Sequence, residues 1–150
     1  MENNMISVKR HVKTICVNKS GQTISIDMED QEFVSGIVGV VRRFEDKQKE
    51  YRQKIQELET MPHETEAEQI AQAHAVSAFS AQLCRELKTE VDAAFRDHVC
   101  EKVFGNITPS LELFAEFFRQ LHPFIKEAAV ERNKRIRKYT EKYQKRSGVG

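Results

Sequence analysis

Residues 31–59 read QEFVSGIVGVVRRFEDKQKEYRQKIQELE, and this stretch decides the fold. Its first half places apolar residues three and four apart, at Phe33, Ile37, Val40, Val41 and Phe44. That period matches one face of an α-helix, so the sequence predicts a helix that faces the core. The stripe then thins to Tyr51, Ile55 and Leu58 among charged residues, which predicts an exposed seam for self-association into a homo-oligomer.

Two glycines, Gly36 and Gly39, lie inside this predicted helix. A glycine within a helix costs about 1 kcal/mol relative to alanine, because it has more conformational freedom to lose. Close approach by another backbone would explain their presence. We therefore expect both glycines to lie against a neighbouring element.

Upstream, residues 12–28 read VKTICVNKSGQTISIDM and predict a β-hairpin. Apolar residues alternate with polar ones on both sides of a turn that runs from Asn18 to Gly21, and the glycine supplies the positive φ angle that such a turn needs. A lone hairpin is marginally stable, so its apolar face should lie on a helix or on a neighbouring subunit. Asp27 or Asp30 is the expected cap of the helix that follows.

Downstream, Thr65 and Glu68 have the spacing of a capping box and predict a second helix over residues 66–97. Its predicted apolar side consists of Ile70, Ala73, Ser77, Ala81, Cys84, Leu87, Val91 and Phe95. The short connection before Thr65 implies that the two helices form an antiparallel helical hairpin.

A helical turn that ends at Gly105 is expected before the last helix, with Thr108 as N-cap and Pro109 as the first helical residue. This helix, over residues 109–145, is rich in phenylalanine, and Pro123 predicts a kink in it because proline removes a backbone donor and clashes with the preceding turn. The predicted fold is mostly α, of the α+β kind. It is a single domain over residues 1–150, in which an N-terminal β-hairpin is followed by a bundle of long helices.

Composition excludes several classes of protein. Six glycines and three prolines in 150 residues are too few to punctuate an all-β fold. A net charge of +1 gives no whole-molecule attraction to nucleic acid or to an acidic membrane. No apolar run approaches the ~20 residues that cross a bilayer, and the N-terminal residues lack the apolar region of a signal peptide. We therefore expect a cytoplasmic protein without a membrane partner.

No pattern in the sequence indicates catalysis. The three cysteines, Cys16, Cys84 and Cys100, are not accompanied by a glycine-rich elbow or an oxyanion loop, so we expect no enzyme and no catalytic residue. His98 and Cys100 with Cys84 or His74 lack the spacing of a zinc site, so no metal is expected. Neither a Walker motif nor a GxGxxG occurs, and no cofactor is expected.

Residues 126–146 contain nine Lys or Arg and three Glu, a local charge of +6. This segment is expected to be a solvated helix, a docking site for an acidic protein, or, through Tyr139 and Tyr143 as well, a nucleic-acid-binding surface; we rank the protein partner above nucleic acid. The phenylalanines upstream are either core or, in part, an exposed interface. The candidate partner-binding residues are Phe114, Phe117, Phe118, Leu121, Phe124, Arg132, Arg135 and Lys138.

A series of short motifs runs through residues 91–146. They are Val-Asp-x-x-Phe at 91–95, Lys-Val-Phe-Gly at 102–105, Pro-Ser-Leu at 109–111, Glu-Phe-Phe at 116–118 and Pro-Phe-Ile at 123–125 before the basic helix. With these motifs, about half the chain resembles small proteins from the tail regions of phages and prophages of Gram-positive bacteria. The hairpin and the helix that begins near Phe33 are similar too. One departure is Arg96-Asp97-His98, where those proteins have a glycine-rich turn.

The resemblance implies a tail assembly chaperone, which is a helical, non-enzymatic protein that coats the tape-measure protein while tail-tube subunits polymerise around it. The implied partner is the tape-measure protein or another tail protein, and the implied location is the cytoplasm of the bacterial host. Two other functions stay open: a phage-encoded adaptor or inhibitor that binds a host or defence protein, and a nucleic-acid-binding module that uses the basic C-terminal helix.

Overall fold

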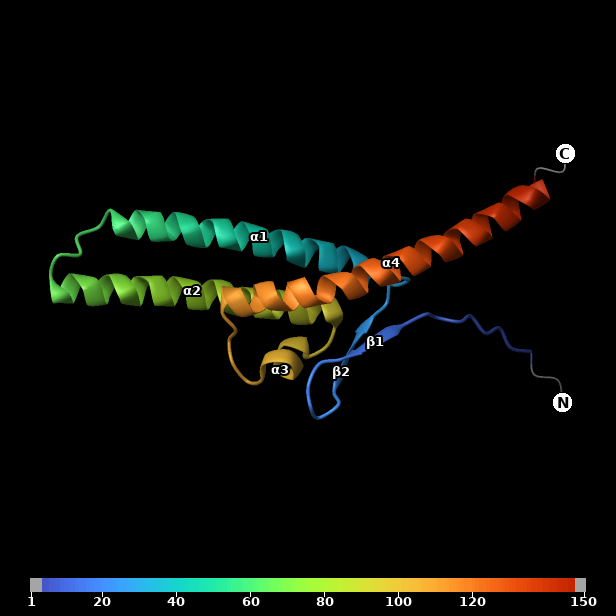
Figure 1. Ribbon diagram of the computed structural model, residues 1–150, viewed down its shortest axis with the longest axis horizontal. Helices are drawn as coiled ribbons and strands as arrows, with labels where there is room; N and C mark the ends of the chain where they lie inside the picture. Colours follow the sequence, from blue (N-terminus) through green and yellow to red (C-terminus); the bar gives the residue numbers. More distant parts are fainter. Residues whose placement is uncertain (1–3, 148–150) are drawn as a thin grey trace.

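The computed structural model describes the backbone of residues 4–147 and side chains as far as residue 144. Within this range the chain forms a two-stranded hairpin followed by four helices (Figure 1). The elements are β1 (Lys13–Cys16), β2 (Thr23–Ile26), α1 (Gln31–Glu59), α2 (Glu66–Phe95), α3 (Val99–Phe104) and α4 (Leu111–Ser147). The predicted fold class, with its N-terminal hairpin and helical bundle, is confirmed.

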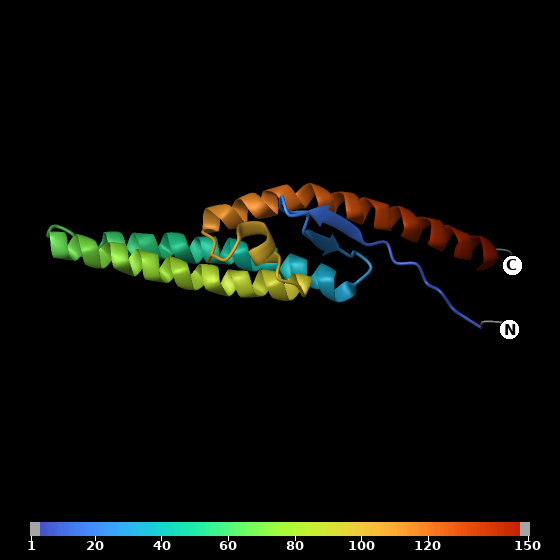
Figure 2. The same cartoon turned by 90° about the horizontal axis from the view of Figure 1, so that it is seen from below.

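The molecule is elongated in both views (Figures 1 and 2). Helices α1 and α2 run antiparallel, as predicted, and their connecting loop lies at one end of the molecule. The first half of α4 lies over α1 and α2, in the part of these helices that is near β1 and β2 (Figure 2). The second half of α4 projects away from the end of the molecule opposite the α1–α2 loop. None of the helices in the described range is long and apolar enough to cross a membrane.

The helix starts follow from their caps. The Asp30 side chain accepts hydrogen bonds from the backbone N–H groups of Glu32 and Phe33, at 3.0 and 3.4 Å, and begins α1. Thr65 Oγ1 accepts from the N–H of Glu68 at 3.1 Å, while Glu68 accepts from the N–H of Thr65, which is the predicted capping box. Helix α2 ends at Phe95 rather than at residue 97, because Arg96 adopts a left-handed conformation with φ of 54°.

The hairpin packs against the helices, as expected. Ile15 pairs with Ile24 across the two strands, and Ile24 and Ile26 are buried in the main core. Gly21 supplies the turn with φ of +80°. Helix α3 is joined to the hairpin by Lys102, whose Nζ donates to the Thr23 carbonyl at 3.0 Å.

Phenylalanine rings link all four helices in the core. Phe33 of α1 meets Phe95 of α2 edge-on at 5.4 Å between centroids, and Phe95 contacts Phe117 of α4. Phe104 of α3 then lies 5.5 Å from Phe114 of α4. Such edge-on ring contacts add to the free energy of burial, about 0.5–1.5 kcal/mol per pair.

The two glycines of α1 have different surroundings. A Cβ added at Gly36 would lie 3.3 Å from the Cβ of Ala94 and 3.4 Å from its Cα, so α2 does approach closely there. At Gly39 the prediction of a neighbouring backbone is wrong. A Cβ there would meet only the guanidinium of Arg43, at 3.0 Å, which belongs to the same helix.

Two further details correct the sequence-based prediction of the helices, and a third concerns Pro123. Ile70, assigned to the apolar side of α2, is 63% exposed, and Val41 of α1 is exposed as well. Helix α4 begins at Leu111 rather than at residue 109, and its cap is Ser110 rather than the predicted Thr108, because Ser110 Oγ accepts from the N–H of Leu113 at 3.2 Å. Pro123 lies within a continuous α4, and the helix bends along its length in both views (Figures 1 and 2).

Candidate functional site

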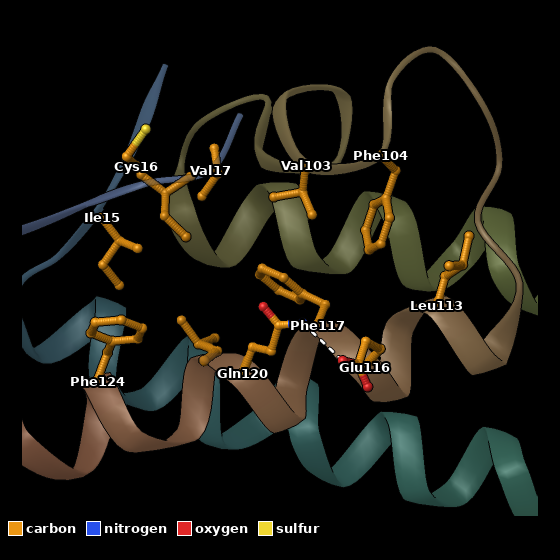
Figure 3. A pocket seen from close by; sticks show the side chains of 12 residues that line it. Ile15, Cys16, Val17, Val103, Phe104, Leu113, Glu116, Phe117, Gln120 and Phe124 are labelled. Atoms are coloured by element: carbon orange, nitrogen blue, oxygen red, sulfur yellow. Dashed lines mark hydrogen bonds between the residues drawn. The ribbon is translucent and has the colours of Figure 1, made fainter. Parts of the chain in front are cut away.

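A groove of about 460 Å³ opens between the hairpin, α3 and the first half of α4, and we call it the apolar groove (Figure 3). Ile15 and Val17 line it from the hairpin, Val103 and Phe104 from α3, and Leu113, Phe117 and Phe124 from α4. Nearly all of these side chains are aliphatic or aromatic. A concave apolar surface of this kind favours burial of an apolar ligand or side chain.

Helix α4 supplies one wall of the apolar groove along a single face. Leu113 and Phe124 lie eleven residues apart, about three turns and roughly 16 Å along the helix axis. Leu113 is 42% exposed and Phe124 is 37% exposed, whereas Phe117 between them is nearly buried. The groove therefore has two accessible apolar ends and a closed aromatic middle.

Polar side chains on the rim of the apolar groove form hydrogen bonds with one another. Glu116 accepts from Arg119 Nε at 3.0 Å and from Gln120 Nε2 at 2.8 Å (Figure 3). The hydrogen bond from Arg119 lowers the pKa of Glu116 to about 2, with Gln120 contributing in the same direction. The carboxylate is thus ionised at neutral pH and already paired. The rim therefore presents fixed polar groups to a bound ligand rather than an unpaired charge.

The cysteines are poorly placed for nucleophilic chemistry. Burial raises the pKa of the Cys84 thiol and, more strongly, that of Cys100, so the reactive thiolate is disfavoured at both positions. Cys16 is exposed at the edge of the apolar groove, and its thiol donates to the Asn18 carbonyl at 3.3 Å. Among the described side chains, no group of three His, Cys, Asp or Glu residues converges on a point where a metal could bind.

The structure divides the predicted partner-binding residues into core and surface. Phe114 is completely buried in the core, and Phe117 and Leu121 are nearly buried, although both also line the apolar groove. Phe118 is half-buried and packs on Phe44 at 5.0 Å between ring centroids. Phe124 remains exposed, because it lies at the open end of the apolar groove.

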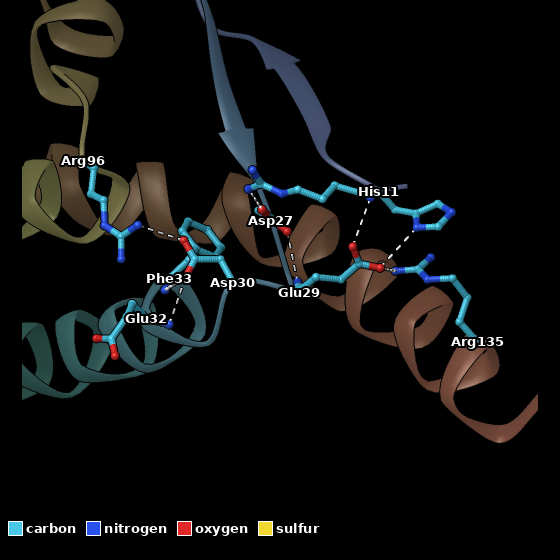
Figure 4. Close-up of polar contacts among 9 residues, drawn as sticks. His11, Asp27, Glu29, Asp30, Glu32, Phe33, Arg96 and Arg135 are labelled. Atoms are coloured by element: carbon cyan, nitrogen blue, oxygen red, sulfur yellow. Dashed lines mark hydrogen bonds and ion pairs between the residues drawn. The ribbon is translucent and has the colours of Figure 1, made fainter. Parts of the chain in front are cut away.

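The predicted basic residues lie further along α4, beyond the apolar groove. Arg132 and Arg135 are half-buried, and Arg135 pairs with Glu29 at 3.5 Å (Figure 4). Lys138 is exposed on the projecting half of α4. The structure therefore separates the phenylalanines and the cations into two surfaces instead of one.

The predicted self-association seam lies on the α2 side of α1. Leu58 is buried, and its carbonyl accepts from Gln72 Nε2 of α2 at 2.8 Å, which removes this residue from an exposed seam. Tyr51 and Ile55 are half-buried. Of the three, Tyr51 lines a surface hollow shared with α2.

Sequence reasoning missed part of the apolar groove. Ile15, Val17, Leu113 and Phe104, which line the groove, are absent from the candidate partner-binding residues predicted from the sequence. The available signal was that the first strand of the hairpin carries apolar side chains as well, in addition to those with which β2 reaches the core. Their meeting with α4 is a contact over about 100 residues of sequence, which periodicity does not encode.

Comparison with known proteins gives one match. No curated protein and no solved structure matches the chain. A protein family, described as a family of unknown function (DUF6673), matches residues 20–148, from the hairpin turn to the end of α4. Because this match extends over most of the sequence, the chain belongs to the family DUF6673.

Proposed function

We propose that this protein is a non-enzymatic tail assembly chaperone that holds an apolar helical segment of the tape-measure protein in its apolar groove, in the cytoplasm of the bacterial host. The observation that carries the proposal is the groove, with accessible Leu113 and Phe124 at its two ends. The resemblance of residues 91–146 to phage tail-region proteins supports the choice of partner.

The dimensions of the apolar groove suit a short amphipathic helix. Three turns of helix present apolar side chains at intervals of three and four residues over roughly 16 Å, the distance that separates Leu113 from Phe124 on α4. Completing the burial of these two side chains would contribute on the order of 1 kcal/mol each. Binding of that strength is reversible, as a chaperone that must leave the assembled tail requires.

The test is co-purification of the full chain with a tape-measure fragment, using Leu113→Glu and Phe124→Glu as separate variants. Each charge would lie in the apolar groove, so we expect the fragment to be lost from the purified complex. Val38→Glu is the matched control, since Val38 is an exposed apolar residue of α1 that does not line the groove. Circular dichroism confirms that each variant is folded. Retention of the fragment by both groove variants, or no co-purification with the unmodified chain, would contradict the proposal.

A further inference from the structure

The two ends of the molecule carry opposite charge. Residues 55–84 contain five glutamates and neither Lys nor Arg, and these glutamates surround the loop between α1 and α2. We call this end the acidic tip; its glutamates are Glu57, Glu59, Glu64, Glu66 and Glu68. At the opposite end, the projecting half of α4 carries the local charge of +6 over residues 126–146 (Figure 1). We call this half the basic tail.

The helical hairpin has a second hollow near the acidic tip, which we call the tip groove. It lies between Tyr51 of α1 and Gln69, Gln72, Ala73, Val76 and Ser80 of α2. Three of its lining side chains, those of Ala73, Ser77 and Ser80, are small, which allows a helix to approach closely. Aromatic side chains from such a helix would find room there.

The tip groove continues the surface on which α4 itself packs. Tyr51 and Ser80 line both the tip groove and an adjoining hollow, and that hollow is closed by Leu111, Glu112 and Ala115 at the start of α4. The first half of α4 thus occupies one part of the α1–α2 surface and leaves the next part open. A second helix in line with α4 would extend an intramolecular packing arrangement that the fold already uses.

The basic tail has a face that fits this position. Ile136, Tyr139 and Tyr143 recur at spacings of three and four, are exposed, and continue the face that upstream contains the buried Leu121 and Ala128. The two tyrosine rings contact each other at 4.6 Å between centroids and form one aromatic ridge. The same helix face is therefore buried in its first half and accessible in its second.

The lengths of the two surfaces also agree. From Glu66 to Ser80 the helix axis of α2 extends roughly 21 Å, and from Arg132 to Ser147 that of α4 extends roughly 22 Å. Glu57 of the tip already pairs with Lys54, and Arg135 of the tail with Glu29. Electrostatic attraction between the other glutamates of the tip and the other cations of the tail would steer the two surfaces together at low ionic strength.

We propose that the basic tail of one molecule docks in the tip groove of a second copy of this chain. The contact is head-to-tail, so the two copies contribute different surfaces, and the pair keeps one free tip and one free tail for further copies. It leaves the apolar groove open, and the inference does not depend on the proposed chaperone function.

Sedimentation velocity of the full chain, at several protein concentrations and at low and high salt, tests this proposal. The tail variant is Lys138→Glu/Lys142→Glu, and the tip variant is Glu59→Lys/Glu66→Lys, which spares the capping box. The matched control, Lys19→Glu/Arg42→Glu, changes the net charge as the tail variant does, but at exposed positions away from both surfaces. Every sample is measured before and after treatment with nuclease.

We expect the unmodified chain and the control to associate increasingly with concentration and to dissociate as salt screens the charges. The tail variant and the tip variant should each sediment as monomers, and an equimolar mixture of the two should associate again. A monomeric unmodified chain, association that survives the tip variant, or association removed by nuclease would each overturn the proposal. The last two results would indicate tail-to-tail pairing and nucleic-acid binding, respectively.

Discussion

Gly36 and Gly39 lie one turn apart on α1, and their surroundings show how strongly a single Cβ position depends on its neighbours. At Gly36 the contact is with Ala94 of α2, whose backbone cannot move without moving the helix. At Gly39 the contact is with the end of the flexible Arg43 side chain, which also pairs with Glu90 at 3.2 Å. The cost of an added methyl group therefore differs between two residues with the same sequence pattern.

Alanine substitution at each glycine separates these two environments. Gly39→Ala should leave the free energy of unfolding unchanged or raise it by up to about 1 kcal/mol, because alanine is the better helix former and Arg43 can move aside. Gly36→Ala should be less stable than Gly39→Ala by about 1 kcal/mol, because the contact with Ala94 offsets that gain. Urea denaturation of both variants measures the difference, and equal stability would show that α1 and α2 are not tightly packed at Gly36.

At the scale of elements, α2 begins far from the main core and depends on its cap. Thr65 and Glu68 satisfy each other's backbone N–H groups at the acidic tip, where the surrounding residues are exposed. Little burial supports this first turn. Its local stability should therefore follow the capping interactions closely.

Thr65→Ala should lower the free energy of local opening at the start of α2 by about 1 kcal/mol. Hydrogen exchange of the amides in the first turns of α2 measures this opening, and those amides should exchange about five times faster while amides near Leu87 stay protected. Thr140→Ala, at an exposed position within α4, is the control and should leave exchange in α2 unchanged. Unaltered exchange in Thr65→Ala would mean that the loop, rather than the cap, holds the first turn.

Two helix starts were predictable from local interactions. The start of α1 at Gln31 and that of α2 at Glu66 follow from Asp30 and Thr65, which act within four residues of sequence. The start of α4 is also set locally, but by Ser110 rather than by the predicted Thr108, because two neighbouring hydroxyl residues offered the same cap. The end of α2 was missed because Arg96 takes a left-handed conformation and pairs with the distant Asp30. The apolar groove was unpredictable because Ile15 and Phe124 meet only in the folded chain.

At the scale of the whole molecule, three distant segments meet beside the β2–α1 turn (Figure 4). Arg10 of the N-terminal segment pairs with Asp27, which also accepts from the N–H of Glu29 at 3.1 Å. Glu29 in turn accepts from the His11 N–H at 3.2 Å and pairs with Arg135 of α4. These polar contacts tie the N-terminal segment and the basic tail to the body of the molecule.

This junction should weaken in acid. Burial acts to raise the pKa of Asp27, but hydrogen bonds from Arg10 and Glu29 outweigh it and hold the pKa below the ordinary value of 3.8. The stabilisation is thus present above that value and is lost as the pH falls through the lowered pKa of the folded state.

Asp27→Asn should reduce the free energy of unfolding at pH 7 and flatten its decline below about pH 4, because the charge that is titrated has been removed. Urea denaturation from pH 7 to pH 3 measures both effects. Glu45→Gln, at an exposed position on α1, is the control and should keep the pH dependence of the unmodified chain. An unchanged pH dependence in Asp27→Asn would assign the acid sensitivity to other carboxylates.

The adjoining pair Tyr139 and Tyr143, whose rings are tilted by 42° to each other, also determines the source of the protein's intrinsic fluorescence. The chain has no tryptophan, and its three tyrosines are this pair on α4 and Tyr51 beside the tip groove. The core is built from phenylalanine, which selective excitation of tyrosine does not reach. Intrinsic tyrosine fluorescence of the unlabelled protein therefore reports on the projecting helix and the tip groove, and the core does not contribute to it.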